Sequence, residues 1–415
     1  MIMEKEYKYL KSINYSDAIG VSDMVEWPLY GIIALNLAMI SEYSVYLKLD
    51  PYFNVAVFAA SMLLFIYRLT IDIPINKVVG VIVFFAFCVV AIFMNHSGMG
   101  VLIKLIWPLS LIFVFKYTRL PERYTVRIGF LMLLAWLMAV YTAFRDAKAI
   151  SMILTHITPY RGINPNTTAM VIASSCLFLE PFLAQFIDTK WHKFILYPVS
   201  LAALAKTLSR TSMIAFGMVI LLELLLKRKI KKSKALGLSI LFFIIAAGIL
   251  FPIVYVYLFK QGIITETTAI LGKNVFTGRQ YIWINLWEYL KQHIDAFIWG
   301  TGYNTSFFLS STDSFSLHNS YLQIFAQFGL PVLLVYIGYL FYLVNGMYDA
   351  KGRMTDLQFK CYQVVLLTLG IGTAEIILTY PPSILFFPLA LGIGNHITTG
   401  GEINDPQSDS LLLVR

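Results

Sequence analysis

Long apolar runs recur along the whole chain of 415 residues and limit the folds open to it more than any other feature. Several approach twenty residues, the length that an α-helix needs to cross about 30 Å of hydrocarbon. Hydrophobic residues make up 58% of the chain and charged residues only 13%, so a soluble domain could not hydrate the resulting surface. A transmembrane β-barrel would show short segments of alternating polarity instead. We therefore expect an all-α, polytopic membrane protein.

The apolar runs predict about twelve transmembrane helices within a single membrane domain over residues 28–397. The expected spans are 28–47, 53–71, 78–95, 100–116, 126–144, 167–187, 193–206, 211–226, 236–259, 321–345, 358–379 and 383–397. Polar segments flank this domain at 1–27 and 398–415. Because the first segment lacks the apolar core and cleavage site of a signal peptide, we expect the first span to direct its own insertion.

Lysine and arginine gather in one set of alternate loops, which the positive-inside rule assigns to the cytoplasm. The densest of these loops, residues 227–234, contains six basic residues. This distribution predicts that both terminal segments are cytoplasmic. It also accounts for the net charge of +9 by membrane topology, without nucleic acid as a partner.

Two outward segments, about 145–166 and 260–320, are longer than ordinary connections and could carry chemistry. The second is rich in aromatic residues and isoleucine, unlike a disordered segment. Within it we expect an amphipathic helix over 278–294, lying at the membrane–water boundary and ending before a break at residues 300–302. The apolar face of that helix would consist of Trp283, Trp287, Leu290 and Ile294.

Four residues on the outward side could act on a substrate, namely Arg161, Arg210, Arg279 and His318. One guanidinium group can donate two parallel hydrogen bonds to a phosphate, and it keeps its charge at every relevant pH. Converging arginines therefore predict a site for a lipid diphosphate. A nearby histidine could take a proton from a hydroxyl. Each residue also has an ordinary explanation: an arginine or histidine at a membrane boundary can contact headgroups or water without any further role.

Cysteine and acidic residues give no sign of a metal site or a cofactor. Cys88, Cys176 and Cys361 lie within apolar runs without CxxC spacing, which argues against a disulfide framework or a thiolate metal site. Neither outer loop contains an Asp-x-Asp motif that could hold a divalent ion beside a diphosphate. We expect neither a metal nor another cofactor.

The same residues lie in short motifs that resemble the O-antigen ligase and polymerase superfamily of bacterial envelope glycosyltransferases. The matching pieces are Asn-Pro-Asn at 164–166, LSRTS at 208–212, TGRQYIW at 277–283, GTGYN at 300–304 and HNSYLQIFAQFGL at 318–330. With the expected span layout and the large outer loop, the resemblance extends over most of the chain.

The resemblance implies a metal-independent, inverting glycosyltransferase in the bacterial inner membrane with its active site facing the periplasm. Its donor would be a glycan on undecaprenyl diphosphate and its acceptor a saccharide, with membrane lipids around it. A chain-length regulator would be a partner only of a polymerase. The catalytic residues would be Arg210, Arg279 and His318. The substrate-binding residues would be Arg161, Asn166, Tyr303 and Asn319.

Three functions remain open at this stage. A polymerase would transfer the glycan to a lipid-linked repeat unit, and a ligase would transfer it to lipid A–core. We favour the polymerase because the form His-Asn-Ser-Tyr-Leu at 318–322 resembles polymerases more closely. The third candidate is a flippase or other transporter, since Glu42, Glu180, Glu223 and Glu375 fall in or near spans, where carboxylates are costly. Glu288 is an alternative to His318 as the base, although its position in the expected helix favours a charged residue on a solvated face.

Overall fold

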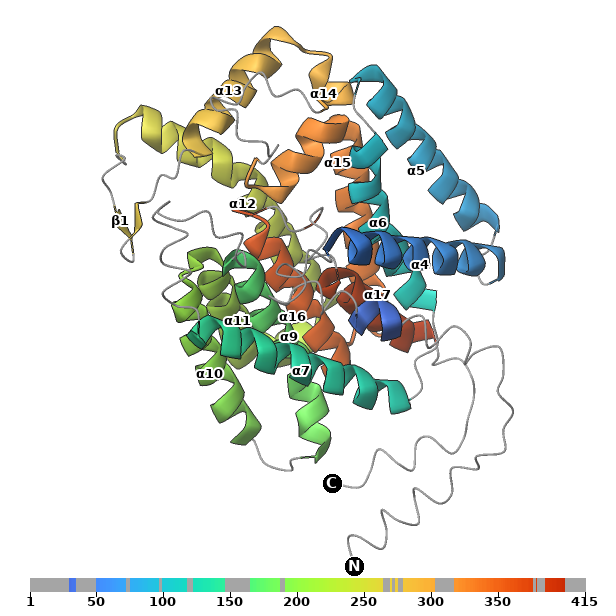
Figure 1. The fold of residues 1–415 in the computed structure, drawn as a ribbon, viewed down its shortest axis with the longest axis vertical. Helices are drawn as coiled ribbons and strands as arrows, with labels where there is room; N and C mark the ends of the chain where they lie inside the picture. The colour runs from blue at the N-terminus through green and yellow to red at the C-terminus, as the bar shows by residue number, and fades with distance from the viewer. Residues whose placement is uncertain are drawn as a thin grey trace, which may run out of the picture.

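The computed structural model describes residues 30–34, 50–71, 75–96, 99–117, 122–145, 165–186, 191–263, 269–270, 273–274, 279–302, 317–375, 378 and 385–399. These residues are almost entirely helical (Figure 1). The helices are α4 (Asp50–Ile71), α5 (Ile75–Met94), α6 (Met99–Tyr117), α7 (Glu122–Arg145), α9 (Pro165–Phe186), α10 (Trp191–Thr207), α11 (Arg210–Lys232), α12 (Lys234–Lys260), α13 (Arg279–Gln292), α14 (Ala296–Trp299), α15 (Ser320–Asn345), α16 (Asp356–Ile371) and α17 (Phe386–Thr399). Two short strands, β1 (Ala269–Ile270) and β2 (Lys273–Asn274), form an antiparallel pair.

Four of the described helices are long and apolar enough to cross a membrane. The qualifying stretches are Arg127–Arg145, Pro165–Ala184, Lys234–Lys260 and Ser320–Asn345. Shorter apolar helical stretches cover Val55–Tyr67, Ile82–Met94 and Phe386–Asn395. The prediction of a helical membrane protein agrees with this architecture. The count of twelve spans stays a prediction, and the terminal segments 1–27 and 400–415 lie outside the described residues.

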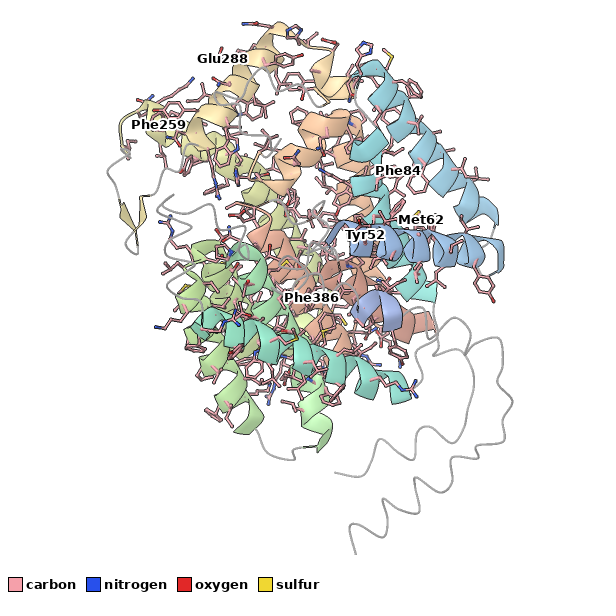
Figure 2. The ribbon with its side chains drawn as sticks, in the orientation of Figure 1. Tyr52, Met62, Phe84, Phe259, Glu288 and Phe386 are labelled. Carbon is pink, nitrogen blue, oxygen red and sulfur yellow. The ribbon has the colours of Figure 1, made fainter. Side chains whose placement is uncertain are left out.

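Helix α16 occupies the middle of the bundle, because nearly its whole surface is buried. It packs against α9, α11, α12 and α17, and α17 in turn packs against α6 (Figure 1). Phe386, at the start of α17, is fully buried and stacks on Phe178 of α9 (Figure 2). Helix α16 ends at Ile371, eight residues before the expected end of its span at 379. The four residues after it form a turn, which belongs to the candidate site below.

The helix expected over 278–294 is confirmed as α13, which lies with α14 over one end of the bundle (Figure 1). Its buried face is Gln280, Trp283, Leu286 and Leu290, and it packs on α12 rather than presenting that face outward. The indole of Trp283 lies edge-on to Tyr255 of α12. Ile294, expected on the same stripe, lies beyond the helix end and is 80% exposed, because the helix stops at Gln292.

Helix α15 contains a kink that the sequence analysis did not predict. Gly329 has a non-helical backbone with φ of 84°, and Pro331 follows it without an N–H to donate. The carbonyl of Ala326, which faces the kink, accepts hydrogen bonds from the backbone N–H and the hydroxyl of Thr301 at 2.6 and 3.0 Å. The expected break at 300–302 therefore does more than end α14: it satisfies backbone groups that the kink exposes.

Four helices meet at a buried network of charges. Lys360 of α16 contacts Glu180 of α9 at 2.6 Å and Glu223 of α11 at 2.5 Å. Lys193 of α10 contacts the other oxygens of the same two carboxylates, each at 2.8 Å. Tyr197 of α10 donates to Glu223 at 2.9 Å. Two ammonium groups thus balance two carboxylates, which is how ionisable groups persist in an apolar interior.

Candidate functional site

The candidate residues that the structure describes lie at helix ends. Arg210 is the first residue of α11, Arg279 is the first residue of α13, and His318 lies two residues before α15 begins. Asn166 is the second residue of α9. Arg161 and Tyr303 lie outside the described residues.

Arg279 and Asn166 meet at a carboxylate that follows α16. The Nη2 group of Arg279 lies 2.8 Å from Oε1 of Glu375, and Nη1 donates to the carbonyl of Ala374 at 2.8 Å. The side-chain amide of Asn166 donates to the same Oε1 at 2.8 Å. Arg279 and Asn166 precede Glu375 by 96 and 209 positions in the sequence, and both reach the same oxygen atom of its carboxylate.

His318 approaches the other oxygen of this carboxylate, with 3.8 Å between Nδ1 and Oε2. Its side chain remains 39% exposed, whereas that of Glu375 is 14% exposed. Its backbone has φ of 49°, a left-handed conformation that is uncommon for any residue but glycine. The preceding Leu317 is held on both sides, since its carbonyl accepts from the Trp283 indole at 2.7 Å and its N–H donates to Gln323 at 2.9 Å. These contacts keep His318 in a strained conformation of the kind found at functional sites.

Arg210 lies close enough to Arg279 for the two charges to interact. Burial lowers the pKa of Arg210, and the positive charge of Arg279 lowers it further. Both guanidinium groups also act electrostatically on Tyr255 of α12. Each arginine opens a helix, where the positive end of the macrodipole disfavours a cation. Two guanidiniums and two helix N-termini contribute positive potential to this region, and the carboxylate of Glu375 balances one of the two guanidinium charges.

Glu375 lies past the end of α16, outside the candidate membrane-spanning helices. Burial would raise the pKa of this carboxyl group. The interaction with His318 and the positive charge of Arg279 outweigh that effect and hold the pKa below the usual glutamate value. The charged carboxylate is therefore the stable form in this environment.

The side-chain amide of Asn319 makes hydrogen bonds within the chain, and its role in substrate binding stays a prediction. The side chain is fully buried, and its Nδ2 group donates to the carbonyls of Gly248 at 2.9 Å and Thr373 at 2.7 Å. Its Oδ1 accepts from the backbone of Leu322 at 2.8 Å, which makes Asn319 the N-cap of α15. The amide expected to bind substrate thus organises the chain around His318.

Glu288, the rival base, lies on the outer side of α13 (Figure 2). It is nine residues from Arg279 along α13, which at 100° per residue turns it to the opposite face. It pairs with Lys291 at 2.9 Å. The residue that sequence reasoning did not assign is Glu375. Its one signal was a carboxylate near the end of an apolar span.

The bundle and its candidate membrane-spanning helices define a helical membrane protein. The O-antigen ligase family model matches residues 196–337, and this match confirms the resemblance to the O-antigen ligase and polymerase superfamily. The matched segment includes Arg210, Arg279 and His318, whereas Asn166 and Glu375 lie outside it. No curated protein matches the chain. The family is described as O-antigen ligase, and the matched segment is less than half of the chain, so the match shows a likeness over residues 196–337.

Proposed function

We propose that the protein is a polymerase that transfers a glycan from undecaprenyl diphosphate to a lipid-linked repeat unit at the periplasmic face of the bacterial inner membrane. The supporting observation is the gathering of Arg279, Asn166 and His318 around one carboxylate, with the charge of Arg210 close to that of Arg279. In the matched family, this collection of groups suits an anionic donor and a hydroxyl acceptor.

In the proposed reaction, the acceptor hydroxyl attacks the anomeric carbon with inversion. The bond to the bridging phosphate oxygen breaks, and undecaprenyl diphosphate leaves with the bonding electrons. Arg210 and Arg279 would stabilise the charge that grows on the leaving diphosphate. His318 would accept the hydroxyl proton. These roles need neither a metal nor another cofactor, so the proposed enzyme is metal-independent.

Substitution of the candidate residues tests this proposal. Arg279→Ala should lower glycan transfer about 10²–10³-fold, the loss typical of a removed charge-stabilising group. His318→Ala should lower it about 10²–10⁴-fold. The matched controls are Arg228→Ala and His293→Ala, because both side chains are exposed and lie outside the site. Normal transfer by either site variant, at normal abundance in the membrane, would remove that residue from the proposed mechanism.

The lipopolysaccharide profile of a deletion strain separates the two acceptors. A single repeat unit on the core supports the polymerase, whereas free polymer with bare core supports the ligase. Purified protein with labelled donor tests the transferase class itself: new glycosidic bonds support the proposal, and translocation of the donor without bond formation would identify a flippase.

A further inference from the structure

A single carboxylate joins three residues of the candidate site. Oε1 of Glu375 accepts from Arg279 and Asn166 at 2.8 Å each, and Oε2 lies 3.8 Å from Nδ1 of His318. The three partners come from α13, α9 and the residues just before α15. No functional role was assigned to Glu375 by the sequence motifs, and it lies 38 residues beyond the end of the family match at residue 337.

The backbone that carries Glu375 is fixed at four consecutive carbonyls. The carbonyl of Gly372 accepts from the N–H of Ser320 at 2.8 Å, and that of Thr373 accepts from Asn319 at 2.7 Å. The next two carbonyls, of Ala374 and Glu375, accept from Arg279 and from the Ser320 hydroxyl, again at 2.8 Å each. All four donors belong to Arg279 or to the residues that follow His318. The turn after α16 is therefore held by hydrogen bonds to Arg279 and to the two residues that follow His318.

We propose that Glu375 is a positioning residue that orients the guanidinium of Arg279 and the imidazole of His318 for transfer. The proposal rests on the proposed function and deepens it. Arginine has five N–H donors; among the described residues, Glu375 and Ala374 occupy two of those of Arg279, which leaves three for phosphate oxygens. Because Nδ1 of His318 faces the carboxylate, Nε2 is the nitrogen left to accept a hydroxyl proton.

A carboxylate in this place could instead occupy the position of a donor phosphate and leave when the donor binds. The four anchored carbonyls argue against that role, because they tie the backbone of the turn to α13 and α15 and leave only rotation of the side chain for a withdrawal of the carboxylate. The two roles predict opposite effects of neutralising Glu375. Loss of a positioning group weakens donor binding, whereas loss of a competing anion strengthens it.

The test uses the full chain in lipid nanodiscs, with undecaprenyl diphosphate as the binding probe. Glu375→Gln should keep the shape of the side chain, bind the probe about tenfold more weakly and transfer glycan more slowly by about 10–100-fold, the usual range for an orienting partner. Asp349→Asn is the matched control, because Asp349 lies in an exposed turn beyond the far end of α15. Unchanged or tighter probe binding by Glu375→Gln would overturn the proposal.

A double substitution distinguishes positioning from a purely structural ion pair. If Glu375 acts through Arg279, then Glu375→Gln should weaken probe binding no further in an Arg279→Lys background. Independent losses in the two variants would overturn the role. Should Glu375→Gln fail to fold, Ser320→Ala decides the matter, since it releases the Glu375 carbonyl and keeps the carboxylate. A fall of a few-fold in binding supports the proposal, and unchanged binding refutes it.

The two levels of inference can fail separately. If wild-type protein neither binds undecaprenyl diphosphate nor forms glycosidic bonds, the proposed function is wrong and the role of Glu375 in it fails as well. If wild-type protein does both and Glu375→Gln matches it, only the positioning role is wrong.

Discussion

Replacing Lys360 with methionine removes an ammonium group that contacts two buried carboxylates. Its Nζ lies 2.6 Å from Glu180 and 2.5 Å from Glu223, and its side chain is 2% exposed. Methionine fills similar space without the charge. Of the two ammonium groups in this network the variant keeps that of Lys193, so the charges of the network change from neutral to one unbalanced negative charge.

Removing one partner of a buried ion pair costs about 3–5 kcal/mol, because the remaining charge is left without compensation in a low-dielectric interior. At about 1.4 kcal/mol per power of ten, Lys360→Met should lower the ratio of folded to unfolded protein roughly 10²–10⁴-fold. The upper part of the range is expected here, because Lys360 contacts both carboxylates and is almost fully buried.

The assay is unfolding of the purified protein by SDS in mixed micelles, with circular dichroism as the measure of the folded fraction. Lys227→Met is the matched control, because Lys227 pairs with Asp356, whose side chain is 67% exposed, and such a pair contributes only about 0–1 kcal/mol. Adding Glu223→Gln to Lys360→Met should restore part of the loss, since one carboxylate then faces one ammonium. A loss no larger than that of Lys227→Met would refute the reasoning.

Three further predictions concern the site and its support. Gly329→Ala should cost about 2–4 kcal/mol of unfolding free energy, because φ is +84° and a new Cβ would collide with the carbonyl of Ile298; a thermal unfolding curve like that of wild type would contradict this. Because folding lowers the pKa of Glu375, its stabilisation is present above the ordinary glutamate pKa and is lost as pH falls through the folded value, so wild type should lose more stability on acidification than Glu375→Gln. Equal acid dependence of the two proteins would count against the Glu375 contacts. Trp283→Phe should cost about 0.5–1.5 kcal/mol through the lost hydrogen bond to Leu317, and should also slow glycan transfer because His318 follows directly; stability loss without slower transfer would limit the indole to a packing role.

The local pattern of residues was sufficient to predict several features of the structure. Apolar run length predicted membrane-length helices, and the break at Leu208 and Ser209 between α10 and α11 falls where two spans were separated. The helix over 278–294 was also readable, since its repeat of apolar residues is a short-range property. Arg210, Arg279 and His318 were identifiable because guanidinium and imidazole groups beside spans are chemically unusual. Their motifs fall within the segment matched by the family model.

The kink at Gly329 was harder to predict from the sequence, although the glycine and the proline that form it are both apparent there. Glycine and proline within an apolar run are compatible with a continuous helix or a bend. Which one occurs depends on whether other groups satisfy the released carbonyls, as Thr301 does for Ala326. That information lies in a different part of the chain.

The sequence by itself determined that this chain is helical, suited to a membrane, and supplied with arginines and a histidine beside its spans. Only the tertiary structure decided what those residues contact. Glu375 meets Arg279 and Asn166 across 96 and 209 positions, and Glu180 is balanced by lysines from two other helices. The physical reason is that hydrophobic periodicity is local, whereas the neutralisation of a buried charge depends on which distant side chain packing brings within 3 Å or so.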